Sequence, residues 1–390
     1  MRGRREPGNK HVRISAALTL RGIRKIMAET GAYGRGKQSD AARLLLAAAR
    51  ERFAVAAADL LLPDAARLSE WQRLTAAALL ARLIHSIEGE LRARLAVSFE
   101  AHPAVHAALS SARVPIALPI LERAQVLRDA ELGNVLVRRV EEHRFWKAHA
   151  PEEGEDLLFE LVRDGDEQIC AEAMELVIAR SRRFDRFQEP DMGQVELPAE
   201  LQHKLVWLVA AALRQYIVQQ HGLAAVDGVI EEAAGSLIAL HDEGATLEAH
   251  ATRLAMRLAA SDRLDGALLH RMLAEGLLPL FIAGAGALTG LDYAATWEVI
   301  ADPRGRGPAI LLRAAGIERD QAAAILLLAN SNGPLISGAE GDATAAQLEL
   351  YDSLDLASAE EVLTLWRAAP GYRTAVARVS TRGRPAAEAA

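Results

Sequence analysis

Apolar residues recur at the three- to four-residue spacing of amphipathic helices along most of the chain. In residues 74–95, for example, Leu79, Leu83, Ile87 and Leu91 fall on one helical face. Only 4% of the residues are aromatic, whereas Ala and Leu, which favour helices, are abundant. This pattern predicts an all-α protein and excludes a mainly β protein, a collagen-like chain and a wholly disordered chain.

Breaks in the helical pattern divide the 390 residues into five segments. They are a basic, flexible N-terminal arm (1–37), N-terminal HEAT-like helical repeats (38–183), a linker (184–198), a C-terminal helical domain (199–372) and a disordered tail (373–390). Ser69 is expected to cap a helix, with Gln72 completing a capping box. Glu88 and Arg92 are expected mostly off the apolar face of that helix.

A short internal repeat lies in the second segment. Its blocks start 25 residues apart, and Glu131–Arg139 matches Asp156–Asp164 most clearly. Helical units of this size bury their apolar faces only against neighbours. We therefore expect a HEAT-like α-solenoid of stacked helical repeats, followed by a C-terminal helical bundle segment.

The net charge of −7 is unevenly distributed. Residues 1–37 carry a net charge of +8, which leaves −15 on the rest of the chain. Such an arm can dock on nucleic acid or an anionic membrane, or can simply be solvated. The basic residues that we assign to this electrostatic arm are Arg2, Arg4, Arg5, Lys10, Arg13, Arg21, Arg24 and Lys25.

No secretory signal and no transmembrane segment is predicted. Two charge-free stretches, 276–291 and 321–339, are interrupted by Gly, Pro or Asn, so they are expected to be buried helices with a bend or a turn. The single cysteine, Cys170, excludes an internal disulfide and any metal site built from several cysteines. We expect a protein of the cytoplasm.

Several polar patterns resemble known sites, but each lacks a required element. Gly31–Lys37 matches the start of a phosphate-binding loop, yet Gln38 replaces the Mg²⁺-binding hydroxyl and a helix precedes it. His102 and His106 lie four residues apart, but Pro103 makes a shared helical register for a metal doubtful. Structural roles are likewise expected for Asp164–Glu167, for Cys170 as a buried thiol, for His143 and His149, and for the group His241, Asp242, Glu243 and His250. No catalytic residue, metal ligand or cofactor is predicted.

The few large aromatic residues are the first candidates for an interaction site. They are Phe145, Trp146 and Trp71, although core packing is an alternative role for each. Arg304 and Arg306 lie in a glycine-rich segment before Pro308. Contact with an anion is one interpretation of these arginines, and a tight turn before a helix is the other.

The order of short motifs along residues 40–330 carries a family resemblance. The motifs are 53–62, 68–73 and 83–88, then 118–121 with 127–132, and finally 264–269, 275–281, 288–291 and 302–305 with 312–316. This succession resembles the domain of unknown function 2336 family, uncharacterised helical proteins typical of alphaproteobacteria. The chain departs from that pattern at Phe145-Trp146 and in its basic arm. The resemblance implies an all-helical, HEAT-like fold and supplies no activity or catalytic residues.

These observations predict a non-enzymatic helical-repeat protein. We expect a scaffold or regulatory adaptor whose partner is another protein. Attachment to nucleic acid or an anionic membrane through residues 1–37 is the alternative. An enzyme would require a pocket in which desolvated carboxylates or histidines converge.

Overall fold

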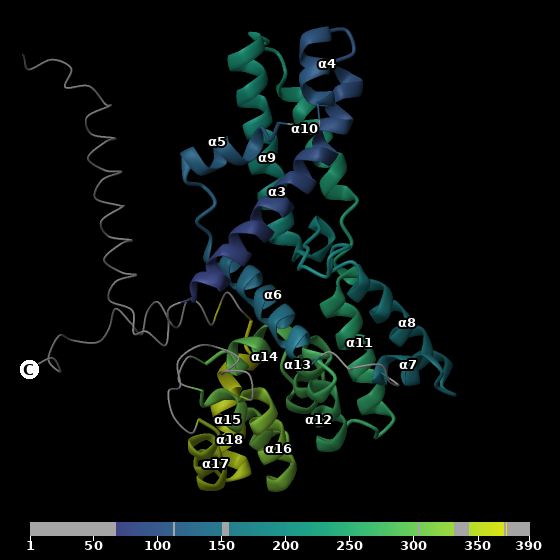
Figure 1. The fold of residues 1–390 in the computed structure, drawn as a ribbon, viewed down its shortest axis with the longest axis vertical. Coiled ribbons are helices and arrows are strands. Elements are labelled where there is room, and N and C mark those ends of the chain that lie inside the picture. The colour runs from purple at the N-terminus through teal and green to yellow at the C-terminus, as the bar shows by residue number, and fades with distance from the viewer. Residues whose placement is uncertain are drawn as a thin grey trace, which may run out of the picture. The chain divides into compact units, whose positions relative to one another are not determined.

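The computed structural model describes residues 68–111, 114–149, 156–302, 305–330, 343–369 and 372, and these residues are mostly helical (Figure 1). The first helices are α3 (Glu70–Ser98), α4 (Pro103–Ser110), α5 (Ala117–Ala124), α6 (Ala130–His149), α7 (Leu157–Val162) and α8 (Glu167–Ser181). They are followed by η2 (Gln194–Glu196), α9 (Ala199–His221), α10 (Asp227–Ala239), η3 (Glu243–Ala245), α11 (Leu247–Ala260), α12 (Gly266–Ala274) and α13 (Leu278–Thr289). The last are α14 (Tyr293–Ile300), α15 (Gly307–Ala314), α16 (Arg319–Asn330), α17 (Ala343–Ser353), α18 (Leu356–Leu363) and η4 (Thr364–Arg367). The prediction of an all-α fold is confirmed.

Helix boundaries follow the capping residues of the sequence. Ser69 and Gln72 form the predicted capping box of α3: the Ser69 N–H donates to Gln72 Oε1 at 2.6 Å, and the Gln72 N–H donates to Ser69 Oγ at 3.2 Å. Asp166 caps α8 through its side chain alone, which accepts from the N–H groups of Gln168 and Ile169. Helix α16 spans Arg319–Asn330, the range that its apolar spacing predicts.

One expectation for α3 is wrong, because Glu88 and Arg92 are buried, with 1% and 5% exposure. They form an ion pair at 2.9 Å. The Glu88 carboxylate also accepts from the N–H groups of Ile116 and Ala117, at 2.9 and 3.0 Å, where α5 begins. Arg92 donates to carbonyl groups at the end of α4, including that of Leu109 at 2.8 Å. The pair therefore satisfies backbone groups that two helix ends leave open.

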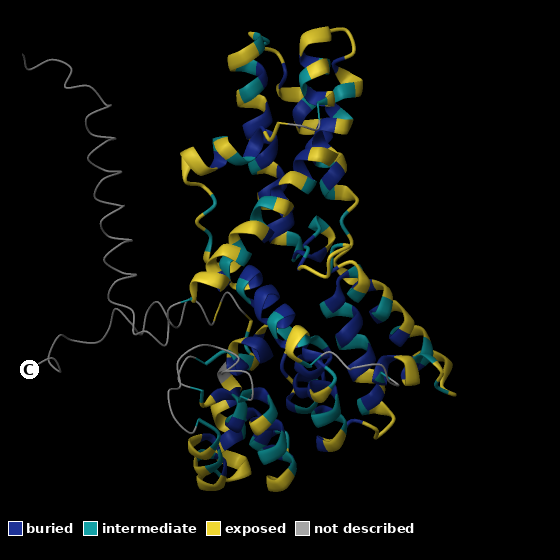
Figure 2. Ribbon diagram, in the orientation of Figure 1, coloured by how far each residue is buried: buried dark blue, intermediate teal, exposed yellow. Residues whose placement is uncertain are grey.

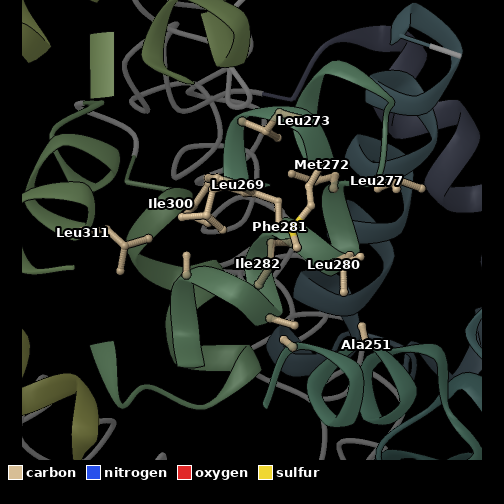
Figure 3. Close-up of a cluster of buried hydrophobic side chains, with 14 of the residues drawn as sticks. Ala251, Leu269, Met272, Leu273, Leu277, Leu280, Phe281, Ile282, Ile300 and Leu311 are labelled. Carbon is tan, nitrogen blue, oxygen red and sulfur yellow. The ribbon is translucent and has the colours of Figure 1, made fainter. Parts of the chain in front are cut away.

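Two hydrophobic cores share α6. The first core packs α3, α4, α5, α9 and α10 with the first half of α6. The second core contains α7, α8 and α11 to α18, together with Phe145 near the end of α6. Buried residues accordingly occur along most of α6 (Figure 2). Figure 3 shows part of the second core, where Leu269, Met272 and Phe281 lie close together.

Each core combines residues from before and after the segment 184–198. Within that segment, η2 is the one helix, and Met192 and Leu197 are buried in the first core. All the described residues belong to one compact unit of residues 63–390. Packing, and not sequence order, therefore decides which helices share a core.

The described residues do not show the 25-residue repeat as a repeated structural unit. Glu131–Arg139 lies in the first half of α6, a helix of 20 residues, whereas Asp156–Asp164 covers α7, a helix of 6 residues. The two segments also contribute to different cores. The described helices differ in length, and a regular solenoid is not shown.

Within the described ranges, no single helix is long and apolar enough to cross a membrane. Helices α13 and α14 reach that length only together, with a bend of 103° between them, and α13 is largely buried in the second core. The predicted arm (1–37), with all its basic residues, and the predicted tail (373–390) lie outside the described residues.

Candidate functional site

Charged side chains gather in the middle of α6, where the two cores meet. Three arginines and three glutamates contact one another there and have no net formal charge together. We call them the junction cluster: Arg138, Arg139 and Glu142 of α6, Arg183 after α8, Glu196 of η2 and Glu248 of α11. All but Glu248 are buried, and Glu248 is half-buried.

Arg183 lies at the centre of the junction cluster. Its Nη1 donates to Glu142 Oε2 at 2.6 Å, its Nε to Glu196 Oε2 at 2.9 Å and its Nη2 to Glu248 Oε2 at 2.7 Å. Each nitrogen of the guanidinium group thus has a carboxylate partner. This one side chain connects α6, η2 and α11, which are distant in the sequence.

Arg138 and Arg139 provide further contacts to the same carboxylates. Arg138 Nη2 donates to Glu248 Oε1 at 2.9 Å. Arg139 Nη1 donates to Glu142 Oε2 at 3.2 Å, and its Nη2 donates to Glu196 Oε2 at 3.3 Å. Every carboxylate of the cluster therefore contacts at least two arginines, which offsets part of the cost of burying it.

Burial and charge have opposite effects on ionisation in the cluster. Burial favours the neutral form of Glu248, but Arg183 and Arg138 outweigh it and hold the pKa of this carboxyl well below its usual range. Burial also lowers the pKa of Arg183, but the three carboxylates outweigh this effect and raise it. Burial, followed by the charge of Glu142, raises the pKa of Tyr293, whose hydroxyl donates to Glu142 Oε1 at 3.2 Å. At neutral pH the carboxyl of Glu248 and the guanidinium of Arg183 are therefore charged, and Tyr293 keeps its proton.

This arrangement is better suited to holding helices in position than to transferring protons. A carboxylate that is already bound by two arginines is a weak proton acceptor. Among the residues whose positions are described, no three His, Cys, Asp or Glu side chains form a group that could hold a metal ion. What the cluster does is fix α6 against η2 and α11.

A small cavity of about 40 Å³ adjoins the junction cluster. Its walls come from α6, α7, α8 and the residues that follow α8, from the start of α11, and from the turn before α13 with the first residues of α13. Two buried polar atoms of lining residues, Arg139 Nε and His143 Nδ1, have no hydrogen-bond partner in the described part of the chain. The lining residues are Arg139, Glu142, His143, Trp146, Leu158, Leu176, Arg180, Arg183, Phe184, Leu247, Gly276, Leu277, Pro279 and Leu280.

The structure gives the neighbouring aromatic residues Phe145 and Trp146 different environments. Phe145 is 3% exposed and stacks on His149, with ring centres 4.1 Å apart, so it belongs to the second core. Trp146 is half-buried and lines the cavity, where its ring centre lies 4.4 Å from that of Phe184. Phe145 is therefore a core residue, and Trp146 borders the candidate site.

The other predicted interaction residues lie elsewhere. Trp71 is 44% exposed on the first turn of α3. Arg306 is exposed, and its Nε donates to Asp302 Oδ2 at 3.1 Å. Gly305 has a φ of +68°, so this segment forms the tight turn that the sequence predicts as one alternative. Arg304 lies outside the described residues.

The remaining polar patterns make local contacts. His102 occupies the N-cap position of α4, directly before Pro103. Cys170 is half-buried, and its Sγ donates to the carbonyl of Val162 at 2.9 Å. His250 is buried beside Arg253, and burial followed by the charge of Arg253 lowers its pKa. The segment 31–37 lies outside the described residues.

Sequence reasoning missed the junction cluster. The only local signal is that Glu142 lies three residues from Arg139 and four from Arg138. The same spacing is common on exposed helices, so it does not identify a buried cluster. Arg183 lies 41 residues from Glu142, and Glu248 lies 110 residues from Arg138, so only the fold brings them together.

Comparison with known proteins identifies a family. A family model described as an uncharacterised protein conserved in bacteria (DUF2336) matches residues 116–364. This range includes the whole junction cluster and the walls of the cavity. No curated protein and no solved structure shows a significant match to the chain.

Proposed function

The chain belongs to the DUF2336 family of uncharacterised bacterial proteins, and we propose that it is a non-enzymatic scaffold or adaptor that binds another protein. The family description carries no activity, so support must come from the surface of the described helices. One observation carries the proposal, the exposed apolar side chains of α8 and of the neighbouring helix α7. A regular helical repeat is not needed for this role.

Three large apolar side chains are exposed on α7 and α8. Phe159 is 54% exposed, Met174 is 44% exposed and Ile178 is 41% exposed. Met174 and Ile178 are one turn apart on α8 and therefore share a face. Together with two exposed glutamates of α8, they define what we call the α8 face: Glu167, Met174, Glu175 and Ile178.

The α8 face combines apolar anchors with negative charge. The opposite side of α8 packs against α7 and α11 through Ile169, Ala173 and Leu176, so the exposed side is not needed for the core. Grouped apolar side chains of this kind on a protein surface are typical of an interaction site. The complementary partner is a protein segment with apolar side chains flanked by lysine or arginine.

Affinity purification with the full-length chain as bait tests the proposal. The double variant M174S/I178S removes the two anchors of α8, and M256S is the matched control, because Met256 is 60% exposed on α11. Bound partner should fall about tenfold or more with M174S/I178S and stay unchanged with M256S. Equal recovery of the same partner by all three proteins would contradict a role of this face.

Deletion of residues 1–37 separates the proposal from its alternative. Capture of the partner should survive the deletion if the α8 face is the binding surface. If the arm is the attachment site, the deletion should instead abolish a salt-sensitive association with nucleic acid or anionic vesicles. Comparing the deletion with M174S/I178S therefore assigns binding to one region or the other.

A further inference from the structure

Two residues that line the cavity beside the junction cluster each have a buried polar atom without a partner among the described residues. Arg139 Nε and His143 Nδ1 belong to side chains that are 4% and 3% exposed. Most buried polar atoms in proteins have a hydrogen-bond partner. These two atoms therefore mark the cavity as a place where a polar group of a ligand can bind.

Apart from Arg180, the other charged groups of the wall are already engaged. The nitrogens of Arg183 all contact carboxylates. Glu142 accepts from Arg183 and Arg139 at Oε2 and from Tyr293 at Oε1, so it is not open to a ligand cation. Arg180 makes a long contact, 3.4 Å from Nη1 to an oxygen of Asp156. The polar groups of the wall that are least engaged are thus an Arg139 N–H, a ring nitrogen of His143 and the guanidinium of Arg180.

The rest of the wall is aromatic and aliphatic. The ring centres of Trp146 and Phe184 are 4.4 Å apart, and each lies 5.9 Å from that of His143. Leucines from four helical segments complete the lining. A cavity of about 40 Å³ holds about three water molecules, so a ligand that fits it must be small.

The turn between α12 and α13 closes one side of this cavity. Gly276 has a φ of +70°, and a Cβ there would lie 3.2 Å from Trp146 Cα and 3.4 Å from its carbonyl oxygen. A glycine is therefore needed both for the backbone angle and for the close approach to α6. The cavity wall is formed by tight backbone packing as well as by side chains.

We propose that this cavity binds a small monocarboxylate with a short apolar tail. The carboxylate accepts from Arg139 Nε and from His143 and faces Arg180, while the tail lies against the leucines and Trp146. A ligand with one negative charge fits the site, because the formal charges of the six members of the junction cluster already balance one another. A doubly charged phosphate would lose more hydration on entering a mostly apolar cavity.

Butyrate is the probe for this site, and butyramide is its uncharged control. Calorimetric titration of the full-length protein should show saturable binding of butyrate, with a Kd of about 1 mM or lower, given the small size of the ligand. Butyramide should bind about tenfold more weakly, because it lacks the charge that Arg180 and Arg139 recognise. Binding should change the fluorescence of Trp146, so the signal should vanish in W146F and persist in W207F, where the exposed Trp207 is replaced.

Two variants locate the carboxylate. R180M alters a partly exposed side chain and should weaken butyrate binding about tenfold. H143F keeps an aromatic ring beside Trp146 and Phe184 but removes the ring nitrogens, and it should weaken binding similarly. If H143F fails to fold, R180M alone still tests whether the cavity binds the carboxylate. Absence of saturable butyrate binding, or a butyrate affinity that R180M leaves unchanged, would overturn the proposal.

Discussion

Replacing Glu88 with glutamine tests whether one buried ion pair stabilises the ends of two helices. The carboxylate of Glu88 accepts from two N–H groups of α5 and from Arg92, and it is 1% exposed. Glutamine keeps one acceptor oxygen, so at least one of these donors loses its partner and Arg92 loses its counter-charge. Breaking a buried pair costs about 3–5 kcal/mol, and an unpaired buried donor costs about 1–3 kcal/mol.

Arg92 would keep its contacts to carbonyl groups of Ala108 and Leu109, at 2.8 Å each, which lessens the loss. We therefore expect E88Q to lower the free energy of unfolding by about 3–4 kcal/mol, a large fraction of the stability of a typical domain. Urea denaturation followed by circular dichroism measures this difference. Hydrogen exchange at Ala117 should also speed up, since its N–H loses its acceptor.

E90Q is the matched control, because Glu90 lies on the same helix and pairs with Arg94 at 2.8 Å while 51% exposed. An exposed pair of this spacing contributes about 0.5 kcal/mol or less. If E88Q and E90Q destabilise the protein equally, the Glu88 carboxylate does not support α4 and α5.

Three further predictions concern the second core and the junction cluster. A Cβ on Gly307 would lie 1.6 Å from a carbonyl oxygen of α14, so G307A should cost more than about 3 kcal/mol in urea denaturation, whereas G228A, with open space around it, should be neutral or slightly stabilising. Y293F removes a hydrogen bond to Glu142 and should cost about 1–2 kcal/mol by the same assay, with binding to the α8 face unchanged. The pKa of Glu248 in the folded protein lies well below 4.5, its ordinary value. The ionised carboxylate therefore contributes its full share to the free energy of unfolding above about pH 5.5, and this share declines as the pH falls through 4.5 and below. Denaturation midpoints between pH 7 and pH 3 should therefore fall less steeply for E248Q than for the wild type, and parallel curves would contradict this assignment.

Local signals in the sequence predicted the helices well. The capping box of Ser69 and Gln72 and the apolar spacing of Arg319–Asn330 depend on residues within one or a few turns, and both match the structure. The glycine-rich turn at Gly305 also follows from local chemistry, because its positive φ favours glycine.

Local sequence signals could not predict contacts between groups that are distant in the sequence. Glu88 and Arg92 appear as an exposed helical pair in the sequence, and only the carbonyl and N–H groups of α4 and α5 turn them into buried caps. Similarly, Glu131–Arg139 and Asp156–Asp164 share an apolar spacing, but the spacing does not determine how long each helix becomes. Trp146 was identified as a candidate for its size, whereas its place beside the cavity depends on Gly276, 130 residues later.

The position of the junction cluster on α6 has a consequence for how this helix can move. Buried apolar residues lie on both sides of the cluster along α6, in the first core before it and in the second core after it. A slide of one turn, about 5.4 Å, would carry Arg138 and Arg139 away from their carboxylates and into a hydrophobic core. An uncompensated buried charge costs several kcal/mol, so the charges oppose a change in the axial register of α6 in addition to its apolar contacts.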